Sequence, residues 1–466
     1  RPAFITTTPM PEDQRCAATA ARSFSLLWLV KFERLAEEAG VSPMYFSTEA
    51  VPAEIPAHVS RFISITGWKP WKRRLDWLNE QIRANPTMSL FVSERFAIEL
   101  AFYEVRKHYR STGNYPWPPK SLEQQRLYSF AAMVSRCHHR LSPSGRKRLR
   151  GMIDHSLKTD DGFASLAFEM KIAAHLMTKG FDVGFNDMEA GRGFDYLVSQ
   201  DNAEVEVECK FVSGDIGRKV HLKRVHQLGG VLLGTIHGLL EKEEGGKLVR
   251  ISIPDRLEGS REQLEEIAGL VDKLISEERL SITQNGYTVS TSGFSLADSP
   301  FGQLPADEIS VELVQQYLFD QHDVDNRNVL VNFRPTKGAV LIVIESEKKD
   351  AVLRGIHAEL KDSARKQFSG DRPGIFCCEL GDLTEEQLLS LGEDRKGGSG
   401  LQYMVTDLLR RRPQIHTIAF TTTGTVYIKE ATSQLTQHTS AQETGPSFVF
   451  KNPQHPLSKD TRYDIF

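Results

Sequence analysis

The sequence predicts an α/β protein, α+β overall, in which a central mixed sheet flanked by helices follows a mainly helical N-terminal domain. Apolar residues recur at helical spacing up to about residue 155, and beyond it short strand-like segments alternate with helical ones. A chain of 466 residues is also too long for one ordinary core. We therefore expect a helical domain over 1–155, a sheet core with an α/β extension over 156–390, and a C-terminal helix, hairpin and polar tail over 391–466.

The composition is typical of a folded soluble protein, with 40% apolar and 26% charged residues. The longest apolar stretch, 228–240, is interrupted by glycines and falls short of the roughly 18 residues that a membrane span needs. The N-terminus lacks a signal-peptide layout, and the five cysteines show no CxxC spacing. We expect a cytoplasmic protein with no membrane contact, in which a net charge of −3 still allows a local basic patch.

The first 155 residues are expected to form aromatic-rich helices. Apolar residues follow helical spacing through 24–40, 71–83 and 89–109. Prolines punctuate these stretches, and four of the five tryptophans lie between Trp28 and Trp77. Tryptophans at this spacing indicate a helical core.

The segment after residue 156 changes from helical to strand-like periodicity. A helix is expected from Asp160 or Asp161 to Lys179, with Gly180 as its C-terminal stop. Three short strands follow in FDVGFN, FDYLVS and EVEVECKFV, and a long amphipathic segment then runs over 218–241.

From residue 247 to about 430, strands and helices alternate. The strands expected there are KLVRISIP, GYTVSTSGFSL, NVLVNFR, AVLIVIES and PGIFCCEL, and HTIAFTTTGTVYIKEA is expected to form a hairpin. This alternation predicts a mixed sheet.

The strand EVEVECKF carries the candidate chemistry. Side chains alternate between the two faces of a strand, so Glu208 and Lys210 share a face opposite an apolar one. A hairpin with FDYLVS would bring Asp195 level with them. Two carboxylates beside an ammonium suit a hard divalent cation such as Mg²⁺, which can activate water and neutralise phosphoryl charge.

In the segments FEMKIAAHLMTKGFDVGFN, GRGFDYLV and VEVECK, the sequence resembles the PD-(D/E)XK, or restriction-endonuclease-like, nucleases over roughly 161–240. The resemblance implies that Asp195 and Glu208 bind Mg²⁺ or Mn²⁺ and that Lys210 is the catalytic lysine. Glu169, on the preceding helix, matches the acidic residue that often completes such a site. DNA is favoured over RNA as the substrate.

Two features depart from this pattern or leave it open. Phe194 replaces the proline that gives the family its name, and Glu206 shares the face of Glu208, which leaves the register arguable. The glutamates of this strand also fit the solvated face of a half-buried hairpin. Glu169 equally fits the edge of an amphipathic helix.

Basic residues beyond the strand could follow a nucleic-acid backbone or lie on a solvated helix face. They are Arg218, Lys219, Lys223 and Arg224. A second basic segment, GRKRLR, precedes the nuclease-like part and supplies Arg146, Lys147, Arg148 and Arg150.

The sequence therefore predicts a metal-dependent deoxyribonuclease, acting in antiphage defence and restriction or in DNA repair. No GxxxxGK[ST] segment is present, so the chain has no P-loop motor of its own. By analogy with the family, a protein partner or a homo-oligomer fits this class. The alternative is a non-catalytic nucleic-acid-binding or assembly subunit that keeps the nuclease fold.

Overall fold

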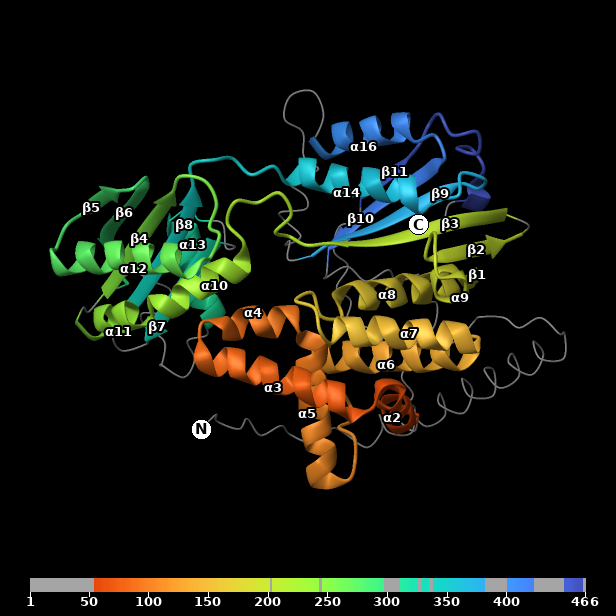
Figure 1. Cartoon of the computed structure of the whole chain (residues 1–466), viewed down its shortest axis with the longest axis horizontal. Coiled ribbons are helices and arrows are strands. Elements are labelled where there is room, and N and C mark those ends of the chain that lie inside the picture. Colours follow the sequence, from red (N-terminus) through yellow and green to blue (C-terminus); the bar gives the residue numbers. More distant parts are fainter. Residues whose placement is uncertain are drawn as a thin grey trace, which may run out of the picture.

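The computed structural model describes residues 54–201, 203–242, 245–296, 311–322, 324, 328–334, 338–381, 400–422 and 448–463. Helices fill the lower half of the molecule in Figure 1, and two separate sheets lie above them. The predicted α/β class is confirmed, and both sheets are mixed. The helix expected over 24–40 lies outside the described residues. Within the described part of the chain, no helix is long and apolar enough to cross a membrane.

The described N-terminal part is helical, as predicted. Its helices are α2 (Ile55–Thr66), α3 (Trp68–Ala84), α4 (Met88–Arg95), α5 (Ala97–Thr112), α6 (Leu122–Arg140) and α7 (Pro143–Ser156). Ser142 accepts a hydrogen bond from the Gly145 N–H and so caps the start of α7. The stretch expected as one helix over 89–109 divides at Phe96 into α4 and α5. Its core is aromatic, with Trp71 fully buried and stacked on Phe163.

The first sheet has the strand order β1-β2-β3-β9-β10-β11. Its strands are β1 (Asp182–Phe185), β2 (Tyr196–Gln200), β3 (Ala203–Val212), β9 (Gly374–Leu380), β10 (Ile415–Thr422) and β11 (Phe448–Lys451). The first three strands form an antiparallel meander, β3, β9 and β10 run parallel, and β11 is antiparallel. The stretch expected as a separate C-terminal part thus supplies two strands of this sheet. The second strand of the hairpin expected near 416–431 lies outside the described residues.

Helices cover both faces of the first sheet. Helix α8 (Ala164–Thr178) packs against the face that presents Val205, Val207 and Cys209. Helices α14 (Val352–Lys366) and α16 (Gly400–Arg411) join the opposite core, around Phe376 and Leu408. Figure 1 shows α8 below the sheet and α14 and α16 above it.

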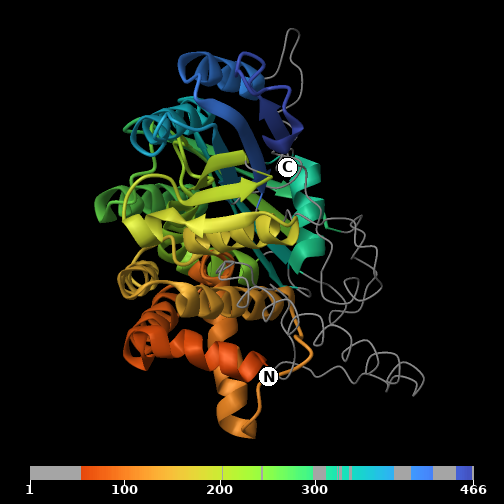
Figure 2. The same ribbon diagram turned by 90° about the vertical axis from the view of Figure 1, so that its right-hand side faces the viewer.

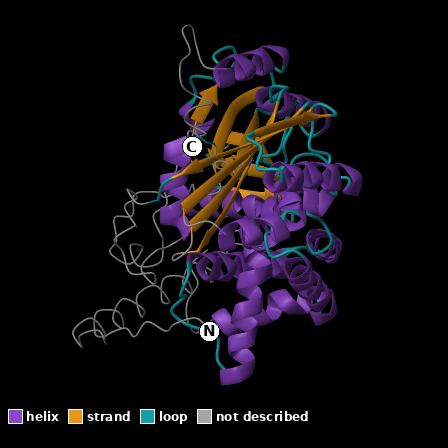
Figure 3. Ribbon diagram, turned by 90° about the vertical axis from the view of Figure 1, so that its left-hand side faces the viewer, coloured by secondary structure: helices purple, strands orange, loops and turns teal. Residues whose placement is uncertain are grey.

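The residues between β3 and α14 build a second sheet with the order β5-β6-β4-β8-β7. Its strands are β4 (Gly245–Ile253), β5 (Ser281–Gln284), β6 (Tyr287–Phe294), β7 (Val329–Arg334) and β8 (Gly338–Ser346). Its helices are α10 (Leu222–Val231), α11 (Leu233–Lys242), α12 (Arg261–Ser276) and α13 (Val311–His322). Figures 2 and 3 show, from opposite sides, the strands gathered above the N-terminal helices.

The amphipathic segment expected over 218–241 contains two helices. Helix α10 ends before Leu232, and α11 begins at Leu233. Their apolar residues Val225, Leu228 and Ile236 belong to the core of the second sheet. The helix that covers β3 after the insertion is α14 instead. The periodicity of a helix shows which of its faces is apolar but not which sheet that face packs against.

Candidate active site

Asp195 is held at the point where β2 begins, between β3 and the short helix α9 (Asn186–Ala190). The backbone N–H of Cys209 on β3 donates a hydrogen bond to Asp195 Oδ2 at 2.6 Å. The Asn186 N–H donates to the backbone carbonyl of Asp195 at 2.8 Å. Burial, together with the charges of Glu208 and Glu169, raises the pKa of Asp195 well above its usual value. Asp195 therefore lies among other acids, as the hairpin predicts.

Glu208 and Lys210 form an ion pair on β3. Lys210 Nζ lies 2.9 Å from Glu208 Oε1, and the Glu208 carboxylate is 1% exposed. Its second oxygen, Oε2, is buried with no hydrogen-bond partner among the described residues. Burial raises the pKa of Glu208 to about 7 although the Lys210 charge lowers it. Burial lowers the pKa of Lys210, but Glu208 outweighs this and leaves it raised, so Lys210 keeps its proton.

Glu169 reaches the same group of acids from α8. It is 9% exposed, and its Oε1 accepts a hydrogen bond from Ser165 Oγ at 3.3 Å. Its Oε2 is buried without a partner in the described part of the chain. Burial, then the charges of Asp187 and Glu208, raise the pKa of Glu169 to about 8. Glu169 is thus buried on α8, and its charge interacts with those of Glu208 and Lys210 on β3.

Asp187, on α9, is a fourth carboxylate that the sequence analysis missed. Its Oδ1 is buried and has no partner among the described residues. Burial raises its pKa to about 6 against the charge of Arg148, and its own charge raises the pKa of Glu169, Asp195 and Glu208. The signal available in the sequence was an acid in the connection that leads from β1 to Asp195.

The remaining glutamates of β3 have partners other than Lys210. Glu206 is 0% exposed and accepts hydrogen bonds from the N–H of Ser369, at 2.8 Å, and from its hydroxyl. Glu204 is exposed and pairs with Arg372 at 2.7 Å. Only Glu204 fits a solvated face, whereas Glu208 alone pairs with Lys210 beside Asp195.

The four basic residues expected to follow a nucleic-acid backbone lie where the chain enters the second sheet. Arg218 pairs with Asp350 at 3.4 Å, Lys219 with Asp255, and Lys223 with Asp160 at 2.6 Å. Arg224 donates to Gln227 Oε1 at 2.8 Å. Each therefore already has a polar partner, and their contact with nucleic acid stays a prediction.

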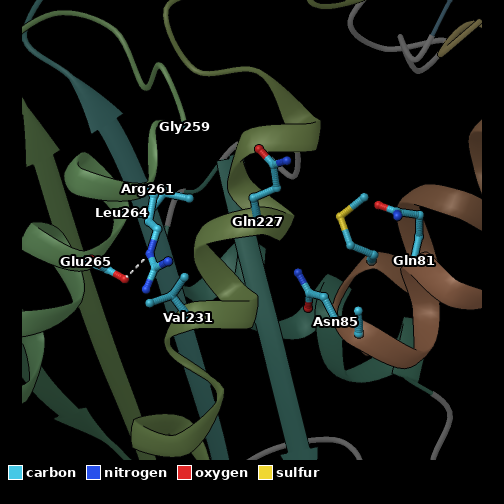
Figure 4. Close-up of a pocket in the computed structure, with 10 residues that line it drawn as sticks. Gln81, Asn85, Gln227, Val231, Gly259, Arg261, Leu264 and Glu265 are labelled. Atoms are coloured by element: carbon cyan, nitrogen blue, oxygen red, sulfur yellow. Dashed lines mark hydrogen bonds and ion pairs between the residues drawn. The ribbon is translucent and has the colours of Figure 1, made fainter.

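A cavity of about 400 Å³ lies apart from the carboxylates (Figure 4). Gln81 and Asn85 border it from the N-terminal helices, and Gln227 faces them from α10. On its α12 side, Arg261 and Glu265 form an exposed ion pair at 2.7 Å. None of the four carboxylates lines this cavity.

The carboxylate site supplies the donors that a hard cation prefers, although they are not gathered into a finished coordination sphere. Within the residues that the structure describes, no three His, Cys, Asp or Glu side chains stand close enough to hold a metal ion. The chemistry of the set nevertheless fits one, because Glu169 and Glu208 each keep a buried oxygen without a hydrogen-bond partner in the described chain, and the charges of neighbouring acids raise the pKa of both. No family model, curated protein or solved structure matches this chain.

Proposed function

We propose that this chain is a metal-dependent nuclease that hydrolyses DNA phosphodiester bonds. The observation that carries the proposal is the Lys210–Glu208 pair, 2.9 Å apart and next to Asp195, in a group of four buried or half-buried acids. A lysine and several acids converging in this way are costly to fold, since like charges repel and burial opposes ionisation. Such strain is typical of an active site rather than of a structural ion pair.

The order of elements supports the resemblance to PD-(D/E)XK nucleases. Helix α8 is followed by β1, by β2 with Asp195 directly before it, and by β3 with Glu208 and Lys210. A helix that covers the same sheet, α14, comes next after the inserted second sheet. This order of helix, acids and lysine supports the proposal, because it is the order that the resemblance implies.

Asp195 and Glu208 are the residues that would hold Mg²⁺ or Mn²⁺, with Glu169 assisting. The bound cation supplies charge neutralisation on the phosphate and an acidified water. Lys210 keeps its proton and places a positive charge beside Glu208, where it can position the attacking water and stabilise negative charge on the phosphate. The Cys209 N–H fixes the orientation of the Asp195 carboxylate.

Antiphage defence and restriction, or DNA repair, are the settings that we propose for this activity. A second candidate is a binding or assembly subunit that keeps the fold without catalysis. The buried Glu208 paired with Lys210 favours the enzyme, because a subunit that only binds has no need to maintain this pair.

The test is cleavage of plasmid and single-stranded DNA with Mg²⁺, Mn²⁺ or EDTA, by the native chain and by Lys210→Ala. Lys171→Ala is a matched control, because Lys171 also pairs with a buried glutamate of this sheet, Glu379, at 2.9 Å. We expect metal-dependent cleavage that Lys210→Ala abolishes and Lys171→Ala retains. Equal activity in all three proteins would place the active site elsewhere, and no cleavage with either metal would favour the binding subunit.

A further inference from the structure

The N-terminal helices carry an excess of positive charge that is not apparent from the net charge of the whole chain. Residues 54–158 contain 19 lysines and arginines but only eight aspartates and glutamates, whereas the net charge of the chain is −3. Part of this excess lies on α7, where Arg146, Lys147 and Arg150 are exposed. Lys147 and Arg150 are three residues apart and so share one face of the helix. Neither forms an ion pair with any residue that the structure describes.

Helix α7 is firmly attached to the segment that carries Asp187. Arg148, on its inner side, donates to the backbone carbonyls of Met188 and Glu189 at 2.8 and 2.5 Å. The Ser142 N–H donates to Glu189 Oε1 at 2.8 Å. At Gly145 a Cβ atom would lie 2.9 Å from the same oxygen, so the two helices are in close contact. The cations of α7 therefore lie on a helix that is fixed to α9, the helix that carries Asp187.

We infer that the exposed face of α7 binds the phosphate backbone of double-stranded DNA and holds it beside the carboxylates. This inference rests on the proposed function, and it names the surface that holds the substrate. A group of four acids repels a polyanion, so a substrate must gain its affinity from cations nearby. Arg192, exposed in the loop that leads from α9 to Asp195 and β2, adds a further cation to this part of the chain.

The residues of α7 indicate backbone contact rather than base stacking. The helix, PSGRKRLRGMIDHS, contains no Phe, Tyr or Trp. Lysine and arginine without aromatic neighbours suit phosphate contacts, which carry no sequence information, and a duplex presents its phosphates without unstacking its bases.

A second basic face, on α3, offers a matched comparison. Lys72 and Arg73 are exposed there, and α3 packs on α2, α4 and α5. Trp68 at the start of α3 has the guanidinium of Arg110 at 5.4 Å from its ring centroid, a combination that suits single strands better than duplexes. Removing two charges from either face changes the net charge of the protein equally.

The experiment compares Lys147→Ala/Arg150→Ala with Lys72→Ala/Arg73→Ala. Binding of a fluorescein-labelled DNA duplex is measured by anisotropy in EDTA, so that no cleavage occurs, over a series of salt concentrations. We expect the α7 variant to bind roughly tenfold more weakly and to lose about 1.8 from the salt slope, since each phosphate contact contributes about 0.9. The α3 variant should stay within about twofold of the native protein.

Equal losses in the two variants would overturn the inference, because they would show a general effect of charge. Native affinity in the α7 variant, or no duplex binding by the native protein, would also overturn it. Thermal unfolding of both variants checks that they are folded, and neither pair is buried. Duplex binding that depends on α7 in a protein that cuts no DNA would refute the proposed activity and leave this inference standing. If the native protein cleaves DNA but its α7 variant binds the duplex normally, the proposed activity would be supported and this inference refuted.

Discussion

Lys210 and Glu208 lie on one face of β3 with Nζ and Oε1 2.9 Å apart, and Glu208 is buried whereas Lys210 is partly exposed. The lysine is thus the partner that allows Glu208 to ionise. Without it, burial and the neighbouring charge of Asp187, which both raise the pKa of Glu208, would be opposed only by weaker effects such as the hydrogen bond from the Asp195 backbone. The pair consequently links the proposed active site to the stability of the fold.

Lys210→Ala should destabilise the protein more at pH 8 than at pH 5. The pKa of Glu208 in the folded protein, about 7, already exceeds its ordinary value of 4.5. Because the folded state binds the Glu208 proton more tightly than the unfolded state, stability falls as the pH rises from 4.5 to about 7. Removing Lys210 raises the pKa of Glu208 in the folded protein further, so the fall continues to higher pH. At pH 8 we expect a loss on the order of 1 to 3 kcal/mol in urea unfolding, as for a buried group left without its partner. A loss that is the same at both pH values would contradict this role for Lys210.

Glu169→Gln should stabilise the protein above neutral pH while abolishing cleavage. Its pKa of about 8 lies above the ordinary 4.5, so its contribution to stability is fully present below pH 4.5 and is lost as the pH rises to 8. Glutamine keeps the shape without the charge. At pH 8.5 we expect the unfolding free energy to rise by roughly 1 to 3 kcal/mol, and at pH 4.5 to change little. Unfolding with urea at the two pH values measures this, and a fall in stability at pH 8.5 would show that Glu169 has a favourable partner.

Sequence reasoning reached the residues whose placement depends on local periodicity. Alternation along β3 placed Glu208 and Lys210 on one face, which follows from the period of a strand. The turn residues between the two strands predicted the hairpin that brings Asp195 level with them. Helix α8 and its Glu169 followed from helical spacing and the stop at Gly180.

Contacts between distant segments were beyond that reasoning. Glu206 has the same strand position and chemistry as Glu208, and only the loop at Ser369, 163 residues away, gives it a separate role. The apolar face of α10 gives no indication that it packs on a second sheet. Asp187 joins the site because the N–H groups of α9 donate to the Asp195 carbonyl. The periodicity of the sequence does not predict this contact.

Arg74→Leu should lower the free energy of unfolding more than a substitution at an exposed position of α3 does. Arg74 and Glu99 are 5% and 1% exposed, with Arg74 Nε 3.4 Å from Glu99 Oε1. Arg74 also donates to the Thr159 carbonyl at 2.6 Å. Loss of the arginine leaves the buried Glu99 without its ion-pair partner, which costs about 3 to 5 kcal/mol. Urea unfolding should show this loss, and Arg73→Leu, at the exposed neighbouring position, should change stability by less than about 0.5 kcal/mol. Similar losses in both variants would mean that the pair contributes nothing specific.

Asp187→Asn tests whether the fourth carboxylate belongs to the site. The backbone N–H groups of Asn186 and Asp187 both donate to the Asp195 carbonyl, which fixes α9 next to Asp195. The Asp187 Oδ1 is buried without a partner in the described chain. If Asp187 adds negative charge to a cation site, its loss should lower Mn²⁺ affinity roughly tenfold and reduce the rise in melting temperature that Mn²⁺ produces. Asp182→Asn is the matched control, because Asp182 is an exposed acid on the adjoining β1. Melting curves with and without Mn²⁺ report this independently of cleavage. An unchanged Mn²⁺ response in Asp187→Asn would confine the site to Asp195, Glu208 and Glu169, whereas a response that disappears in Asp182→Asn as well would indicate a general loss of negative charge.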